Sequence, residues 1–97
     1  MGDPRADSAT VTDNPDQSRY ELAVEGKIVF AIYRRDGATL VIRHVEAPPS
    51  LRGTGAASRL MHGVMEIART QRLKVRPLCS YAAAWLARHE KYRDLLA

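Results

Sequence analysis

Apolar and polar residues follow β-type patterns over three short segments in the first half of the chain. Residues 19–24 alternate polar and apolar side chains, and residues 27–33 and 39–46 are rich in β-branched or aromatic types. Such patterns predict strands. Asp36 and Gly37 lie between the second and third segments, and this dipeptide favours a tight hairpin turn. We therefore predict three antiparallel strands in meander order.

The spacing of apolar residues changes after Pro48 and Pro49, which end the third strand because proline has no backbone donor for a strand ladder. Apolar side chains then recur at helical spacing and predict a long helix over residues 53–71. We expect the apolar face of this helix to belong to the hydrophobic core. It consists of Leu60, Val64, Ile67 and Ala68, flanked by Met61 and Met65.

Shorter elements complete the C-terminal part of the chain. Residues 73–78 form a β-type run, and a strand reached through a helix usually runs parallel to its neighbour. Residues 81–89 are alanine-rich and helical, and residues 92–96 add a further turn or two. The predicted fold class is α/β (α+β), with a mixed sheet of three antiparallel strands plus a parallel strand, one long central helix and short C-terminal helices. Core side chains in this part are predicted at Trp85, Leu86, Tyr92, Leu95 and Leu96.

The length of 97 residues suits one domain of ordinary size. Residues 1–17 contain almost no large apolar side chain, so we interpret them as a disordered N-terminal tail and residues 18–97 as the domain. No apolar run approaches the ~20 residues that cross a bilayer, and the first residues lack the basic and apolar regions of a signal peptide. A cytoplasmic protein with no membrane partner is therefore expected.

Positive charge is concentrated in the second half of the chain. Residues 1–50 carry six Lys or Arg and eight Asp or Glu, whereas residues 51–97 carry nine and three. A basic half favours a polyanionic partner, which is either a nucleic acid backbone or a small molecule rich in phosphate, such as a nucleotide cofactor. A solvated basic surface without a specific partner is the alternative.

Small residues are concentrated between the third predicted strand and the long helix, in segment 51–60. Small side chains let a ligand approach the backbone closely, and the first turn of a helix has unpaired N–H groups that attract anions. The segment lacks the third glycine of a dinucleotide-binding fingerprint and the Lys-Ser/Thr pair of a Walker loop. The order of strand, two prolines, Arg-x-x-Gly-x-Ala and long helix favours a pyrophosphate-binding loop over a simple helix start.

Arg52, Gly55 and Ala57 fit the pattern Gln/Arg-x-x-Gly-x-Gly/Ala, and the loop thereby resembles the acetyl-CoA pyrophosphate motif of the GNAT superfamily of N-acetyltransferases. The chain is similar in particular to the minimal, single-domain branch of YjdJ-like proteins. It departs from that branch at Val45 and Ala47, where threonine and valine are expected, and at Glu90, where proline is expected. Neither departure removes a phosphate contact, but the one at Glu90 can alter the last helix. The matching segments are 19–22, 31–34, 44–49, 51–55, 73–81 and 89–96.

The resemblance implies that the chain binds acetyl-CoA and transfers the acetyl group to an amine, so a CoA thioester and an amine acceptor are the implied partners. It implies that the third strand pairs with the pantetheine arm, and that the thioester lies where this strand separates from the strand at residues 75–78. The identity of the amine is not readable from the sequence. The implied cofactor-binding residues are Val45, Arg52, Gly53, Thr54, Gly55, Ala56, Ala57 and Ser58.

Acetyl transfer to an amine needs an uncharged amine, a path for its proton and a hydrogen-bond donor for the developing oxyanion. His44 and Glu46 are two residues apart on a strand, so they share a face, and either can take the proton, Glu46 through a water. The alternatives are a core or edge histidine for His44 and a surface residue beside Arg52 for Glu46. The resemblance implies that Tyr81 protonates the departing CoA thiolate, and packing against Trp85 is its structural alternative.

Cys79 is the single cysteine, so internal disulfides and metal sites built on paired cysteines are excluded, and no metal site is predicted. The resemblance directs the strand end at Cys79 toward the thioester. A thiolate there can accept the acetyl group transiently or serve as the leaving-group acid. A buried, small apolar residue is the alternative role for a lone cysteine.

Two other functions compete with acetyl transfer. A CoA-binding protein with little or no transferase activity is one, because so short a chain lacks the N-terminal helices that form the acceptor wall in larger GNAT enzymes. A small basic nucleic-acid-binding module is the other. Against it, Phe30 and Tyr33 belong to opposite faces of their strand, and no basic cluster lies on a recognisable recognition helix. We therefore do not expect nucleic acid as a partner.

Overall fold

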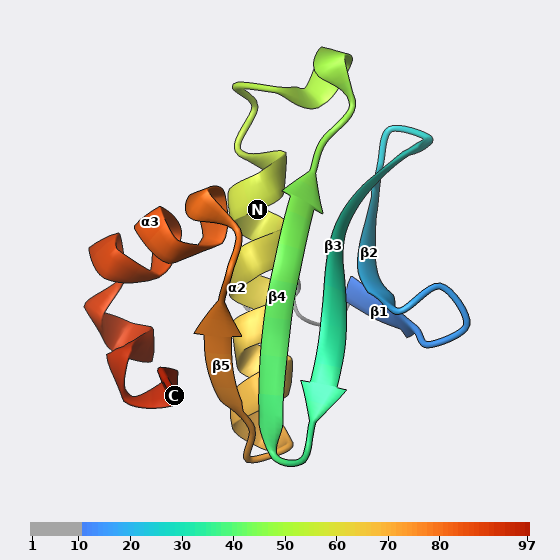
Figure 1. Cartoon of the computed structure of the whole chain (residues 1–97). Helices are drawn as coiled ribbons and strands as arrows, with labels where there is room; N and C mark the ends of the chain where they lie inside the picture. The colour runs from blue at the N-terminus through green and yellow to red at the C-terminus, as the bar shows by residue number, and fades with distance from the viewer. Residues whose placement is uncertain (1–10) are drawn as a thin grey trace.

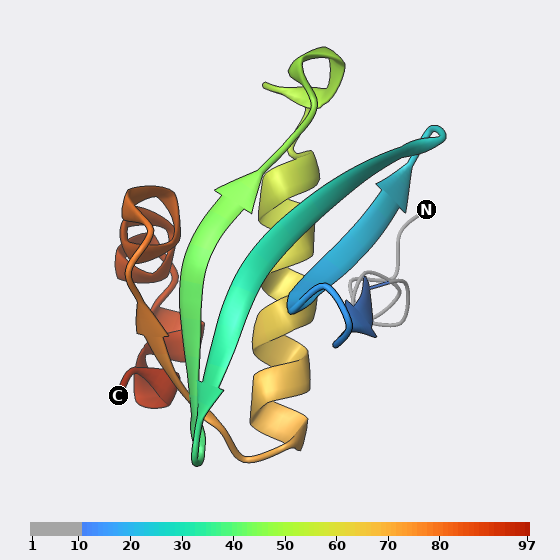
Figure 2. The ribbon, with the colours of Figure 1, turned by 45° about the vertical axis from the view of Figure 1, so that its right-hand side comes forward.

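One mixed sheet with a long helix against one of its faces forms the frame of the molecule, as Figures 1 and 2 show. The computed structural model describes residues 11–97. The five strands lie in the order β1-β2-β3-β4-β5. The strands are β1 Val11–Asn14, β2 Arg19–Val24, β3 Lys27–Asp36, β4 Thr39–Glu46 and β5 Lys74–Pro77. The helices are the 3-10 helix η1 Pro49–Leu51, the α-helices α2 Ala56–Thr70 and α3 Ser80–Arg88, and the 3-10 helix η2 Glu90–Leu95.

The predicted fold class is confirmed. Strands β2, β3 and β4 form the antiparallel meander, and β5 pairs in parallel with β4 after the crossover through α2. Helix α3 and η2 follow β5 and lie at that edge of the sheet (Figure 1). None of the helices between residues 11 and 97 is long and apolar enough to cross a membrane.

Strand β1 corrects the interpretation of residues 1–17 as a tail. Val11 is 6% exposed, and residues 11–14 pair antiparallel with β2 at the far edge of the sheet. Tyr33 donates its hydroxyl proton to Asp13 Oδ1 at 2.6 Å, and Asn14 donates to Glu21 at 3.0 Å. The segment was missed because it contains a single buried apolar residue, and its partners lie on other strands. Residues 1–10 of the predicted tail lie outside the described residues.

The core lies between the inner face of the sheet and α2. Alternate side chains of β2 and β3 are buried there, and the apolar face of α2 packs against them. Of the residues predicted on that face, only Ile67 is half-buried rather than buried. The prediction of Leu96 as core is wrong, since it is 37% exposed and instead pairs through its backbone with Val75 of β5. The other predicted C-terminal core residues are buried: Trp85, Leu86, Tyr92 and Leu95.

Polar side-chain contacts connect η2 to α2. Tyr92 is 1% exposed and donates its hydroxyl to Glu66 Oε2 at 2.7 Å, and Arg69 pairs with Asp94 at 3.0 Å. Burial, and then the bond to the Glu66 carboxylate, raise the pKa of Tyr92 above its usual value. The same bond is the main cause of a lowered Glu66 pKa. The C-terminal segment is thus held against the helix that carries the predicted loop.

A bulge near the end of β4 changes which side chains face the core. Tyr33 lies opposite Ile42 and Ile32 lies opposite His44, so Arg43 is an extra residue without an opposite partner. Beyond this point Val45 lies opposite the buried Ala31 and shares its face of the sheet. The bulge therefore turns Val45 toward the α2 side.

Candidate functional site

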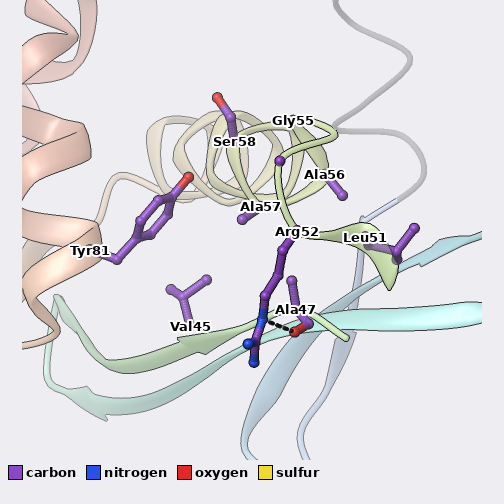
Figure 3. A pocket seen from close by; sticks show the side chains of 10 residues that line it. Val45, Ala47, Leu51, Arg52, Gly55, Ala56, Ala57, Ser58 and Tyr81 are labelled. Atoms are coloured by element: carbon purple, nitrogen blue, oxygen red, sulfur yellow. Dashed lines mark hydrogen bonds between the residues drawn. The ribbon is translucent and has the colours of Figure 1, made fainter. Parts of the chain in front are cut away.

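A pocket of about 450 Å³ lies where the end of β4, the following loop and the first turn of α2 meet, as Figure 3 shows. Helix α3 contributes Tyr81 to its wall. Most of the lining side chains are small or apolar. They are Val45, Ala47, Leu51, Arg52, Gly53, Gly55, Ala56, Ala57, Ser58 and Tyr81. Seven of the eight predicted cofactor-binding residues therefore line a single pocket.

Two glycines give the loop its shape. Gly53 has φ of 80° and Gly55 has φ of 87°, which is the left-handed region that residues with a Cβ adopt at a cost. A Cβ built on either glycine meets no atom within 4 Å. The backbone conformation therefore favours glycine at both positions, and the space beside them is open to a ligand.

The first turn of α2 presents backbone donors at the pocket. The first bond of the helical ladder is donated by Arg59 N to Gly55 O at 3.0 Å. Within residues 11–97 the N–H groups of Ala57 and Ser58 donate to no acceptor. The helix has no acidic residue in this turn, so its partial positive charge is not neutralised there. Such a turn favours an anion.

Thr54 is the predicted cofactor-binding residue that the pocket does not include. Its hydroxyl donates to Leu51 O at 2.5 Å and accepts a bond from Ala56 N at 3.3 Å. Both contacts lie within the loop. Thr54 therefore shapes the loop and accepts a hydrogen bond from the N–H of the first residue of α2.

Arg52 is the cationic side chain of the pocket wall. Its Nε donates to Ala47 O at 3.3 Å, the dashed line in Figure 3, which ties the loop back to the end of the strand. The residue as a whole is exposed. The terminal nitrogens of the guanidinium remain available to a phosphate, for which its planar donor arrangement is well suited.

Tyr81 reaches the pocket from the first turn of α3. In Figure 3 its ring extends toward the first turn of α2, where Ala57 and Ser58 lie. Burial is the main cause of a pKa of Tyr81 above its usual value, so the phenol keeps its proton at neutral pH. The structure thus brings a protonated hydroxyl to the predicted loop.

His44 and Glu46 lie on the other face of the sheet. Their side chains are 53% and 52% exposed, and His44 Nε2 lies 3.0 Å from Glu46 Oε1. They lie opposite Ile32 and Phe30 of β3, and Val45 between them faces the pocket. The sequence placed the two residues together correctly, but the structure does not bring them into the pocket.

Cys79 is half-buried at the N-cap of α3 and packs against the core. Its backbone N–H donates to Ile42 O at 3.3 Å, and its side chain is not part of the pocket lining. The thiol therefore lies outside the pocket wall, although it is near enough to Tyr81 to contribute to the raised pKa of that phenol. No cluster of three or more metal-ligating side chains occurs in the part of the chain that the structure describes.

Strand β4 is open along its final residues. Its pairing with β5 covers Thr39–Ile42 and ends where Leu78 N and Cys79 N both donate to Ile42 O. Residues 44–46 pair with β3 alone, and the bulged Arg43 pairs with neither strand. The two parallel strands therefore part beside the pocket, as the family resemblance led us to expect.

Sequence reasoning missed Ala47 and Leu51 as parts of the pocket wall. Both lie in the segments that carry the family resemblance, but a small or apolar side chain has no chemistry to single it out. Their positions next to the two-proline turn and the loop were the available signal.

Comparison with solved structures supports the fold. A protein from Staphylococcus aureus described as GCN5-like, whose solution structure was determined by NMR, superposes with a TM-score of 0.66. The two sequences are 22% identical, and the match covers 90% of this chain and 86% of the other. No curated protein sequence matches this chain. At this identity the likeness shows the fold alone.

The family model supplies the assignment that the fold cannot. The model for GCN5-related N-acetyltransferases matches residues 19–95, which include every strand from β2 onward, the loop and Tyr81. The match is to this family as a whole and does not test the resemblance to the narrower YjdJ-like branch. A match over most of the chain, on a fold with the expected open strand and loop, shows that the chain belongs to the GCN5-related N-acetyltransferase family of acyltransferases.

Proposed function

We propose that the chain binds acetyl-CoA in the pocket and transfers its acetyl group to an amine. One observation carries this proposal: the pocket joins the unbonded N–H groups of Ala57 and Ser58 to the open part of β4. A pyrophosphate fits the first feature and an amide-containing arm fits the second. The apolar wall between them suits the methylene groups of such an arm.

The residues fit each part of this substrate. The guanidinium of Arg52 and the N–H groups of the first turn of α2 would hold the pyrophosphate, since all of them donate hydrogen bonds. The open space beside Gly53 and Gly55 would let the pyrophosphate approach the backbone. The backbone of residues 43–46 would pair with the amides of the arm, because β5 leaves it unpaired on that side. Val45 and Tyr81 would flank the thioester end.

Transfer forms a bond between the amine nitrogen and the acetyl carbon and breaks the carbon–sulfur bond. The amine must lose one proton, and the departing thiolate gains one. We assign the donation to Tyr81, whose raised pKa keeps it protonated, and which lines the pocket. For the removal we propose the hydrogen-bonded pair of His44 and Glu46, which lies on the opposite face of the open stretch of β4 and would act through a water, across the gap where β4 and β5 part.

Direct attack on the thioester accounts for the geometry better than an acetylated cysteine, since Tyr81 lines the pocket and Cys79 does not. We expect Tyr81→Phe to lower kcat by about 100-fold or more with little change in the Kd for acetyl-CoA. Cys79→Ala should retain activity. The measurement is CoA release with a panel of small primary amines and lysine peptides. A hydroxylamine-labile acetyl group on the protein, lost in Cys79→Ser, would support the cysteine route instead.

Binding itself is tested by thermal unfolding with CoA and acetyl-CoA. At a hundredfold excess over Kd, binding to the folded state alone adds about 2.7 kcal/mol. For a domain of this size the gain corresponds to an increase in Tm of roughly 10 °C. An unchanged Tm, together with salt-sensitive binding to nucleic acid, would favour the basic nucleic-acid-binding module instead.

A further inference from the structure

Ser58 in the first turn of α2 is held by a side chain from another helix. Trp85 of α3 donates its indole N–H to Ser58 Oγ at 2.9 Å. An indole nitrogen can only donate, so Ser58 must be the acceptor in this bond. The contact joins a residue of the pocket wall to a tryptophan that is 1% exposed.

The acceptor role leaves the hydroxyl proton of Ser58 unused. Among residues 11–97, Ser58 Oγ donates to no acceptor, whereas the hydroxyl of Thr54 is already committed to Leu51 O. A helical serine otherwise turns back to bond a carbonyl of the preceding turn. The bond from Trp85 opposes that rotation, so the Ser58 proton stays available to a group in the pocket.

Trp85 is itself immobilised by aromatic neighbours. Its ring stacks on His89 with centroids 3.7 Å apart, and the ring of His62 meets it edge-on at 4.8 Å. Its backbone carbonyl lies 2.6 Å from His89 Nδ1. Tyr92, tied to Glu66, closes the cluster at a centroid distance of 5.8 Å. The indole N–H therefore has a defined direction.

We propose that Trp85 is a positioning residue that holds the Ser58 hydroxyl as a hydrogen-bond donor to a phosphate oxygen in the pocket. Ser58 then offers two donors to one anion, its side-chain O–H and its backbone N–H. A hydrogen bond to a charged acceptor is stronger than one to a neutral group. The inference rests on the proposed function, because the anion is the CoA pyrophosphate.

The test is a double-mutant cycle on the Kd for CoA, measured on folded protein by calorimetry. We expect Ser58→Ala to weaken binding about tenfold, as for a lost bond to a charged group. Trp85→Phe should weaken it by nearly as much. In the Ser58→Ala background, Trp85→Phe should then change Kd less than about twofold, because the hydroxyl through which it acts is gone.

Trp85 is the only tryptophan of the chain, so residue-specific incorporation replaces it alone. 3-Benzothienylalanine keeps the shape of the ring but has sulfur in place of the N–H, and 4-fluorotryptophan keeps the N–H as the matched control. We expect the first to weaken CoA binding about as much as Trp85→Phe and the second to leave it unchanged. This measurement decides the question if Trp85→Phe does not fold.

Inorganic pyrophosphate serves as a second probe and separates the two proposals. Coupled losses for pyrophosphate without CoA binding would contradict the proposed function and support the role of Trp85. Normal CoA binding with equal effects of Trp85→Phe in both backgrounds, or with no effect of the benzothienyl analogue, would overturn the role of Trp85 alone. Failure of the unmodified protein to bind either probe would overturn both.

Discussion

Replacing Gly55 by glutamate is expected to abolish CoA binding and acetyl transfer while leaving the protein folded. The new side chain would start in open space, since a Cβ at Gly55 meets no protein atom within 4 Å. Gly55 lines the pocket together with Ala57 and Ser58, whose N–H groups have no acceptor among residues 11–97. A carboxylate there would both fill the anion site and repel a pyrophosphate.

Backbone strain must be separated from this effect. Gly55 has φ of 87°, so any residue with a Cβ costs about 1–2 kcal/mol there. Gly37→Glu is the matched control, because Gly37 has φ of 60°, equally open surroundings and a position at the opposite end of β4. Calorimetry should show normal CoA binding for Gly37→Glu and none for Gly55→Glu. Equal affinities for the two variants would contradict a pyrophosphate site at this loop.

Removal of residues 11–17 is expected to lower Tm by roughly 10 °C relative to a chain that begins at Val11. The shorter chain loses the buried Val11 side chain, worth about 2 kcal/mol, and the pairing with β2. It also leaves the Tyr33 hydroxyl without Asp13, at a further cost of about 1 kcal/mol. The size of the change follows from the small unfolding entropy of a domain of this length.

The difference in Tm between these two truncated chains measures the contribution of residues 11–17, and thus of β1, without any contribution from residues 1–10. Circular dichroism on heating gives both Tm values. The interpretation of residues 1–17 as a tail predicts no difference between them. Asp13→Ala in the longer chain should give part of the loss, because it removes the acceptor of Tyr33 and retains the strand.

The loop could be predicted from the sequence because its chemistry is local. Gly53, Gly55 and the small residues that follow act through their own backbone, in a loop that two prolines precede and the long helix follows. The strand meander and the helical crossover could be predicted for the same reason, since the spacing of apolar residues within each segment indicates its strand or helix. Strand β1 was not, because a run of four residues with one buried side chain has no such pattern.

The faces of β4 show where local reasoning ends. The spacing of His44 and Glu46 correctly placed them together, and in the structure they form a hydrogen bond. A spacing of two cannot say which face they occupy, because a bulge changes the alternation. Here the extra residue, Arg43, shifts the alternation by one position, so that Val45 faces the pocket and His44 does not. The contact between Trp85 and Ser58 could not be predicted either, since it joins two residues that lie 27 positions apart on different helices.

The open part of β4 also bears on how the protein avoids self-association. A strand with unpaired backbone groups is a template on which another chain can add a strand. Here the unpaired stretch covers only residues 43–46, and three of its four side chains, Arg43, His44 and Glu46, are exposed and polar or charged. A short, kinked and charged edge resists the addition of a further strand. The features that keep this backbone open to a small ligand therefore also protect it from aggregation.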